Sequence, residues 1–388
     1  MKHEILASMA IVVYYSLLTL RWNVYGSSLT ALISNLLMTS FALAGLLTVL
    51  RIEFHNHKLD IFKKRKDLKI ILTLFFIGII SSLFNNNIGF DGIIMSLQIA
   101  GLSSLLLTFK LNYKLMKFSL NANFIYFFLL IILGLDPNEI WIGGSRNMIS
   151  VVLIAQGTLF YVSTYQNKKS VSVLPALLIF LISIWAFGRG GILTTLIFLV
   201  GILGYAISSR YDIPALVASA KKDDEIKYGS YMLIGIIISL IAVTYWGITN
   251  SNLDFAVRFR EQGLVETGRT SARVEYFSRA TDSFRPFFWG VTIEGNEVFG
   301  AWYLSYNLHN SFLYLHATRG FLGFLQISLL VFQAFIKHIK TKNNLFLIIF
   351  VALLVRMSID TIAFVGNAIF EPLFYLMIFS KKIASENT

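Results

Sequence analysis

Long runs of apolar residues, separated by polar segments, recur along the whole chain. Each run is about 20 residues long, which is the helix length needed to cross a hydrocarbon core of about 30 Å. The pattern therefore predicts an all-α polytopic membrane protein with about 12 transmembrane helices. We place these spans at 4–21, 28–50, 70–86, 92–109, 119–135, 147–165, 171–187, 191–208, 229–249, 319–336, 344–359 and 361–380.

The polar connections between the predicted spans are short except at 51–69, 209–228 and 250–308. No internal repeat and no low-complexity segment divides the chain. An arginine and a tryptophan follow the first apolar run, where a signal peptide would have small residues, so we expect a retained span. The chain 1–388 is expected to form a single integral membrane domain.

Composition supports this fold class and excludes several kinds of site. Hydrophobic residues make up 56% of the chain and charged residues 14%, whereas soluble domains are about a quarter charged. The chain has no cysteine, which excludes disulfides and thiolate metal sites. Nothing resembles a Walker, Rossmann or His-Glu-x-x-His motif, and no Asp-x-Asp occurs on the predicted outer side.

The distribution of basic residues predicts the orientation of the chain. With the N-terminus in the cytoplasm, all 19 lysines and only three arginines fall on the cytoplasmic side, while 11 arginines fall outside. Both termini and the loops 51–69 and 209–228 are then cytoplasmic, and 250–308 is a long outer loop between spans 9 and 10. The net charge of +12 therefore reflects positive-inside topology and not a nucleic-acid surface.

Two outer arginines lie in glycine-rich turns where spans begin or end. Arg189 lies in the sequence Phe-Gly-Arg-Gly-Gly between spans 7 and 8, and Arg146 follows Gly-Gly-Ser at the start of span 6. An arginine at membrane depth usually faces a cavity, and its guanidinium group can bind phosphate in bidentate geometry. A plain turn with a snorkelling arginine is the alternative at both positions. We interpret both residues as candidate anion ligands.

The long outer loop carries a third group of arginines. Arg269 and Arg273 are four residues apart and share a helix face, where their mutual repulsion favours an anion between them. The stretch ends at 285–290 with Arg-Pro-Phe-Phe-Trp-Gly, an amphipathic sequence typical of a membrane surface. The alternative is that positive-inside selection removed lysines and that these arginines pair with local acids.

Two histidines and one carboxylate complete the candidates. His309 begins an apolar helix, where an imidazole can act as a base near neutral pH, although a structural histidine is the alternative. His316 lies two turns later on the same face, and we expect a supporting role for it. Glu371 lies within the last span and should face the bundle interior, towards Arg189 or Arg356.

Four motifs follow one another along the second half of the chain. They are the Gly188-Arg189-Gly190 turn, Gly268-Arg269 opening the outer loop, Arg285-Pro286 followed by Gly290, and His309-Asn310 before the Gly320–Gly323 helix. In this order they resemble the O-antigen ligase/polymerase superfamily, over roughly residues 140–380. The chain departs from the family pattern in two ways: Gly188 replaces the usual serine of a Ser-Arg-Gly turn, and only the first part of a Pro-x-x-Gly-x-Gly stretch is kept.

This resemblance implies a GT-C-like glycosyltransferase in the bacterial inner (cytoplasmic) membrane, with its active site facing the periplasm. The glycan donor would be linked to undecaprenyl pyrophosphate, and neither a metal nor another cofactor would be needed. Arg189 and Arg269 would bind the pyrophosphate, and His309 would act as the base or orienting group for the acceptor hydroxyl. The candidate substrate-binding residues are Arg146, Arg273, Asn310, Arg319 and Glu371.

Within this superfamily the arginine-rich outer loops favour an O-antigen polymerase, whose acceptor is the next lipid-linked repeat unit. A polymerase would also have membrane lipid and a chain-length regulator protein as partners. A ligase, which transfers the glycan to lipid A–core, is the alternative. A transporter or flippase of lipid-linked sugars is the alternative from another class, but a carrier has little use for the long loop 250–308.

Overall fold

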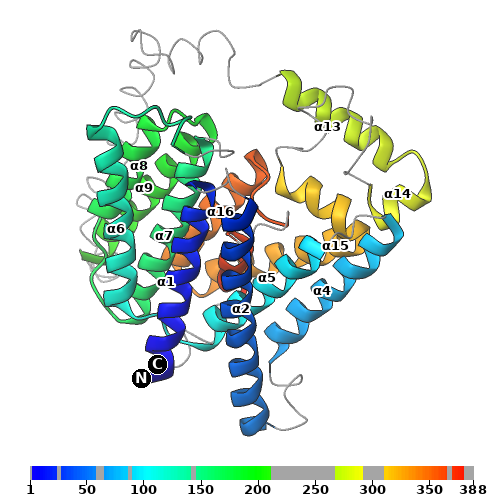
Figure 1. The fold of residues 1–388 in the computed structure, drawn as a ribbon, viewed down its shortest axis with the longest axis horizontal. Helices are drawn as coiled ribbons and strands as arrows, with labels where there is room; N and C mark the ends of the chain where they lie inside the picture. The colour runs from blue at the N-terminus through cyan, green and yellow to red at the C-terminus, as the bar shows by residue number, and fades with distance from the viewer. Residues whose placement is uncertain are drawn as a thin grey trace, which may run out of the picture.

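The computed structural model describes residues 2–23, 28–57, 65–85, 90–140, 146–210, 267–291, 310–364 and 369–379. All regular secondary structure in these ranges is helical (Figure 1). The helices are α1 (Lys2–Asn23), α2 (Ser28–His57), α4 (Lys66–Asn85), α5 (Phe90–Thr108), α6 (Tyr113–Ile132), α7 (Asn147–Gln166), α8 (Leu174–Trp185), α9 (Arg189–Arg210), α13 (Thr267–Ala280), α14 (Phe284–Trp289), α15 (Ser311–Lys340), α16 (Asn344–Ile359) and α17 (Glu371–Phe379).

Five of the described helices are long and apolar enough to cross a membrane. The all-helical fold class that we predicted from the sequence is therefore confirmed for the described residues, and the five apolar helices are consistent with a helical membrane protein. The predicted number of about 12 spans stays a prediction. The predicted span 229–249 lies outside the described residues, and every other predicted span overlaps a described helix. The five segments are Leu36–His55, Tyr113–Ile132, Asn147–Gln166, Arg189–Ser209 and Ser311–Lys340.

Helix α7 is the centre of one half of the molecule. Its neighbours include α6, α8 and α9, which stand around it in Figure 1, and nearly all of its residues from Ile149 to Gln166 are buried. Its sequence mixes apolar residues with Gln, Ser and Thr on all faces, so no polar face exists that could point to water. Ser119 of α6 donates a hydrogen bond of 2.9 Å to Gln156, which satisfies part of this buried polarity.

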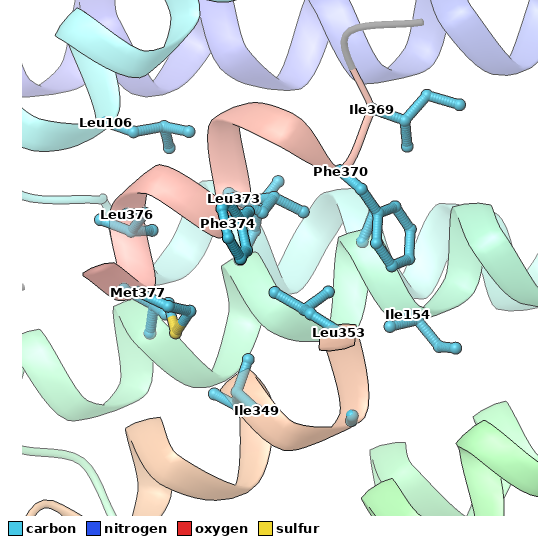
Figure 2. Packing of buried hydrophobic residues seen from close by; sticks show 14 of the residues in the cluster. Leu106, Ile154, Ile349, Leu353, Ile369, Phe370, Leu373, Phe374, Leu376 and Met377 are labelled. Atoms are coloured by element: carbon cyan, nitrogen blue, oxygen red, sulfur yellow. The ribbon is translucent and has the colours of Figure 1, made fainter. Parts of the chain in front are cut away.

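The last predicted span is not one continuous helix. Residues 361–364 are not helical, and α17 begins only at Glu371. Nine helical residues extend about 13 Å at 1.5 Å per residue, so α17 makes up only part of the predicted span and is shorter than a hydrocarbon core of about 30 Å. Figure 2 shows that α17 is instead enclosed by α5, α7 and α16, with Phe374 and Met377 packed near Ile349 and Leu353. Its apolar sequence reflects burial in protein, not contact with lipid.

Helix α15 contains a kink that the apolar pattern does not show. Gly320 has φ 64° and ψ −172°, which interrupts the helix one third of the way along. Gly290, with φ 98°, ends α14 directly against this kink. A Cβ atom on Gly320 would collide with the carbonyl of Phe288, and one on Gly290 would collide with the carbonyl of Ala317. The two glycines thus let α14 and α15 meet backbone to backbone.

The predicted loop 51–69 is shorter than expected. Helix α2 continues to His57 and α4 begins at Lys66. Between them, Arg65 forms an ion pair with Glu53 and another of 2.8 Å with Asp67, and it donates a hydrogen bond of 3.1 Å to Thr108 of α5. Buried charges are stable only when paired. Arg65 therefore joins the ends of α2, α4 and α5.

Candidate functional site

The Phe-Gly-Arg-Gly-Gly turn lies against the first turn of α7. A Cβ atom on Gly188 would come within 2.5 Å of the side-chain oxygen of Asn147, and one on Gly191 would collide with the Ser150 hydroxyl. The glycines are therefore required for this close approach. Arg189 is the first residue of α9 and is half-buried, and Arg146, also half-buried, immediately precedes α7. The two arginines that the sequence predicted separately lie on adjoining helix ends.

Arg356, near the end of α16, lies beside this junction. Its side chain is 1% exposed, donates a hydrogen bond of 3.1 Å to the carbonyl of Asn147, and forms an ion pair of 3.3 Å with Asp360. One of its terminal nitrogens lies 3.0 Å from where a Cβ atom on Gly190 would be. Arg356 therefore links the starts of α7 and α9 to the end of α16.

The beginning of α15 is attached to the same segment. Asn310 caps α15 by accepting hydrogen bonds from the backbone of Phe312 and Leu313, at 2.9 and 3.0 Å. Its side-chain amide also donates to the carbonyl of Ser358 at 3.1 Å, and its own N–H donates to the Thr361 hydroxyl. The side chain of Asn310 thus has a local positioning role, and its predicted contact with substrate stays a prediction.

Ser311 strengthens this attachment from within the core. Its buried hydroxyl donates 2.8 Å to the carbonyl of Asp360 and accepts from the backbone N–H groups of Ile362 and Ala363. His309, the predicted base, lies outside the described residues, directly before this anchored pair. The position of the chain next to His309 is therefore fixed relative to Arg356 and Asp360.

Four chain segments that are far apart in sequence thus meet at one end of the helical bundle: 146–150, 188–191, 310–311 and 356–361. Helices α7, α9 and α15 all present their N-termini there. Because a helix N-terminus carries partial positive charge, their dipoles add to the charges of Arg146 and Arg189. The arrangement is suited to binding an anion with several oxygen atoms.

Arg319 and Glu371 are brought together, but as a pair within the core. Arg319 donates 2.7 Å to Glu371, whose carboxylate also accepts from the Tyr375 hydroxyl at 2.8 Å and from the backbone of Phe364 at 3.2 Å. Glu371 is fully buried. The prediction that Glu371 points towards Arg189 or Arg356 is therefore wrong, because Arg319 is its partner and Arg356 pairs with Asp360.

Arg269 and Arg273 of the outer loop lie on α13, which the i, i+4 spacing predicted to be helical. Arg273 is half-buried, and the side chain of Arg269 lies outside the described part of the structure. His316 joins this helix to α15 and α14, since its ring nitrogens contact the Tyr276 hydroxyl at 2.6 Å and the Phe287 carbonyl at 2.7 Å. The carbonyl can only accept, so Nε2 of His316 carries a proton.

Burial raises the pKa of the Tyr276 hydroxyl, which therefore stays protonated at neutral pH. It donates to Nδ1 of His316, and the neutral imidazole satisfies both of its neighbours. This agrees with the supporting role that we expected for His316.

Sequence reasoning missed the residues that hold the site together. Asn147, Ser311 and Tyr375 resemble any polar residue within an apolar run, and no spacing distinguishes them. The Arg356 and Asp360 pair did carry a signal, because opposite charges four residues apart at the end of a span are expected to pair.

Among the residues that the structure describes, no group of three His, Asp or Glu side chains is placed to hold a metal ion. Comparison with known proteins gave no family assignment: no family model, no curated protein and no solved structure matches this chain. The geometry of the described residues is therefore the basis for any functional conclusion.

Proposed function

We propose that this chain is an O-antigen polymerase of the bacterial inner membrane, with twelve spans and a periplasmic active site. The observation that carries the proposal is the junction of four segments around Arg146, Arg189 and Arg356, with Asn310 and Ser311 anchored to the same place. At this junction the candidate pyrophosphate ligands lie close to Asn310, the residue directly after the candidate base His309. A transferase with two substrates requires such proximity between the donor site and the acceptor site.

Contacts between helix ends support the predicted alternation of spans. The ends of α7, α9, α15 and α16 that meet at the candidate site are all predicted to be periplasmic. The ends that meet at Arg65 are all predicted to be cytoplasmic, as are the ends joined by the 2.9 Å contact between His338 and the carbonyl of Met377. One span more or one fewer between α9 and α15 would place joined ends on opposite sides.

The proposed reaction is a direct displacement at the anomeric carbon of the donor glycan. The hydroxyl oxygen of the acceptor sugar forms the new bond while the bond to the polyprenyl pyrophosphate breaks, which inverts the linkage. The hydroxyl proton passes to His309 or to solvent, and the pyrophosphate leaves with the electron pair. Arg189, Arg146 and Arg269 stabilise the charge that develops on the leaving group, as fixed donors do in other transferases.

Reconstitution with lipid-linked substrate tests this proposal directly. Purified protein in vesicles would receive undecaprenyl-pyrophosphate-linked repeat units extracted from a strain that lacks the gene. We expect longer lipid-linked glycans to form in the presence of EDTA, and Arg189→Ala to reduce this turnover by two orders of magnitude or more. Arg51→Ala is the matched control, because this exposed arginine lies on α2, away from the junction.

Two results would overturn the proposal. Turnover by Arg189→Ala at the wild-type rate would show that the junction around Arg146, Arg189 and Arg356 does not take part in the reaction. Absence of elongation together with transfer of the glycan to added lipid A–core would identify a ligase instead.

A further inference from the structure

Helices α13 and α14 expose large apolar side chains in a part of the chain that is not a span. Val274 and Phe277 of α13 are 63% and 54% exposed, and Phe284 and Phe287 of α14 are 72% and 39% exposed. The opposite face of α13 is buried, with Tyr276 1% exposed and packed on α15. These four exposed residues form what we call the loop-helix face. Within the described residues, no other segment covers it.

The position of this face follows from the kink in α15. From Gly320 to Lys340, α15 is about 30 Å long at 1.5 Å per residue, which matches the hydrocarbon thickness. With the basic residues at the end of α15 on the cytoplasmic side, we therefore place the kink at the outer boundary between membrane and water. Helix α14 ends on this kink through Gly290, and Figure 1 shows α13 and α14 beside α15 and α4, away from the α6–α9 bundle.

The lipid-facing surface of α15 continues into the loop-helix face. After the kink, α15 exposes apolar side chains at helical spacing on one side, as expected for contact with acyl chains. Phe321, at the upper end of this surface, stacks on Phe287 with ring centroids 5.0 Å apart. The exposed apolar side chains of α15 are Leu322, Leu325, Leu329, Phe332, Phe335 and Ile339.

The charges beside the face complement an anionic membrane. Residues 267–291 contain four arginines and two acidic residues, which leaves a positive segment. Arg285 is exposed next to Phe284, and Arg279, whose side chain is 43% exposed, pairs with Glu275 on the surface. Aromatic residues with arginines at the end of a span are typical of the headgroup region.

We propose that the loop-helix face docks on the outer leaflet of the membrane that α15 crosses. Val274, Phe277, Phe284 and Phe287 insert among the lipid headgroups and upper acyl chains, and Arg285 contacts lipid phosphate. Docking there would serve a transporter as well as a transferase, so the inference is independent of the proposed reaction. If the proposed function holds, α13 also carries Arg269 and Arg273 at the depth of the donor pyrophosphate.

The absence of cysteine makes the test direct. Single variants Val274→Cys, Phe277→Cys and Phe284→Cys would be labelled with an environment-sensitive fluorophore in vesicles of phosphatidylethanolamine and phosphatidylglycerol. Lipids with a nitroxide near the headgroup should quench these labels several-fold more strongly than the label at Asp282→Cys, an exposed polar control. Leu329→Cys, on the lipid-facing surface of α15, should be quenched best by a nitroxide deep in the chains.

The outcomes separate three arrangements. Quenching at 274, 277 and 284 equal to that at Asp282→Cys would show that the face points to water and would overturn the proposal. Disulfide cross-linking between unlabelled copies of these cysteine variants, without lipid quenching of the labelled ones, would show that a second copy covers the face and would overturn it too. Weaker quenching in Arg285→Gln, or when phosphatidylglycerol is left out, would support the charge contact. Each replaced side chain is exposed, and three independent positions guard against one variant that fails to fold.

Discussion

Removal of the Glu371 carboxylate should strongly destabilise the protein. Glu371→Ala eliminates hydrogen bonds from Arg319, Tyr375 and the backbone of Phe364 at 2.7, 2.8 and 3.2 Å. It also leaves the buried Arg319 without its counter-charge. Loss of one partner of a buried ion pair typically destabilises a protein by about 3–5 kcal/mol.

This loss converts to a measurable shift in the unfolding temperature. With an unfolding entropy of about 2.1 cal/mol/K per residue, a chain of 388 residues changes by about 0.8 kcal/mol per degree. Glu371→Ala should therefore lower the midpoint of thermal unfolding in detergent by about 4–6 °C. The matched control is Glu275→Ala, because that carboxylate pairs with Arg279 at the surface and should change the midpoint by less than about 1 °C.

A double variant distinguishes the ion pair from simple loss of packing. Arg319→Met with Glu371→Leu replaces both charges by apolar groups of similar size, and such replacements are often neutral or stabilising. We expect the double variant to unfold at or above the temperature of either single variant. If the two single effects simply added, the buried pair would not be the source of the loss and the reasoning would be refuted.

Three further predictions concern the kink at Gly320, the junction residue Arg356 and the buried Tyr276. In Gly320→Ala an alanine would have to adopt φ 64°, and its Cβ atom would collide with the carbonyl of Phe288. Helix α14 should therefore detach from α15, and the loop after α13 should become sensitive to limited proteolysis. Arg356→Gln should lower kcat without a matching change in KM, because it displaces the starts of α7 and α9, and Arg356→Lys should retain part of the activity. Equal loss of activity in both variants, explained by loss of folded protein alone, would contradict this. Burial raises the pKa of Tyr276, so the stability that its protonated hydroxyl contributes is complete below about pH 10, the pKa in the unfolded chain, and is lost as the pH rises further. The unfolding temperature of the wild type should therefore fall above about pH 10, and Tyr276→Phe should remove this part of the fall in a pH series of thermal unfolding.

Hydropathy predicted the helices well because each run of apolar residues must form internal hydrogen bonds, whether lipid or protein surrounds it. It could not distinguish these two environments. Residues 361–380 are as apolar as a lipid-facing span, yet α17 is buried among α5, α7 and α16. The kink at Gly320 was also invisible, because a single glycine in an apolar run is common and only the contact with α14 requires its positive φ.

The candidate site was predicted as separate pieces. Glycines around Arg189 indicated close packing, and Asn310 before an apolar run indicated a helix start, but neither pattern identifies the partner residue on another helix. Glu371 shows this limit most clearly: its sequence position indicated an interior cation, for which we named Arg189 or Arg356, and nothing in the sequence pattern favoured Arg319 over them. The ion pair with Arg319 depends on how α15 and α17 pack, which the chain sequence alone does not reveal.

We propose that Arg146, Arg189 and Arg356, together with His309, form the site at which a lipid-linked glycan is extended. It is tested most directly by deleting the gene in a strain that makes long O-antigen, complementing it with single variants, and separating the lipopolysaccharide on a gel. We predict a full ladder with wild type and with Arg51→Ala, and a single repeat unit on the core with Arg189→Ala or His309→Ala. A normal ladder in both site variants would contradict the account, and bare core with long lipid-linked polymer would identify a ligase.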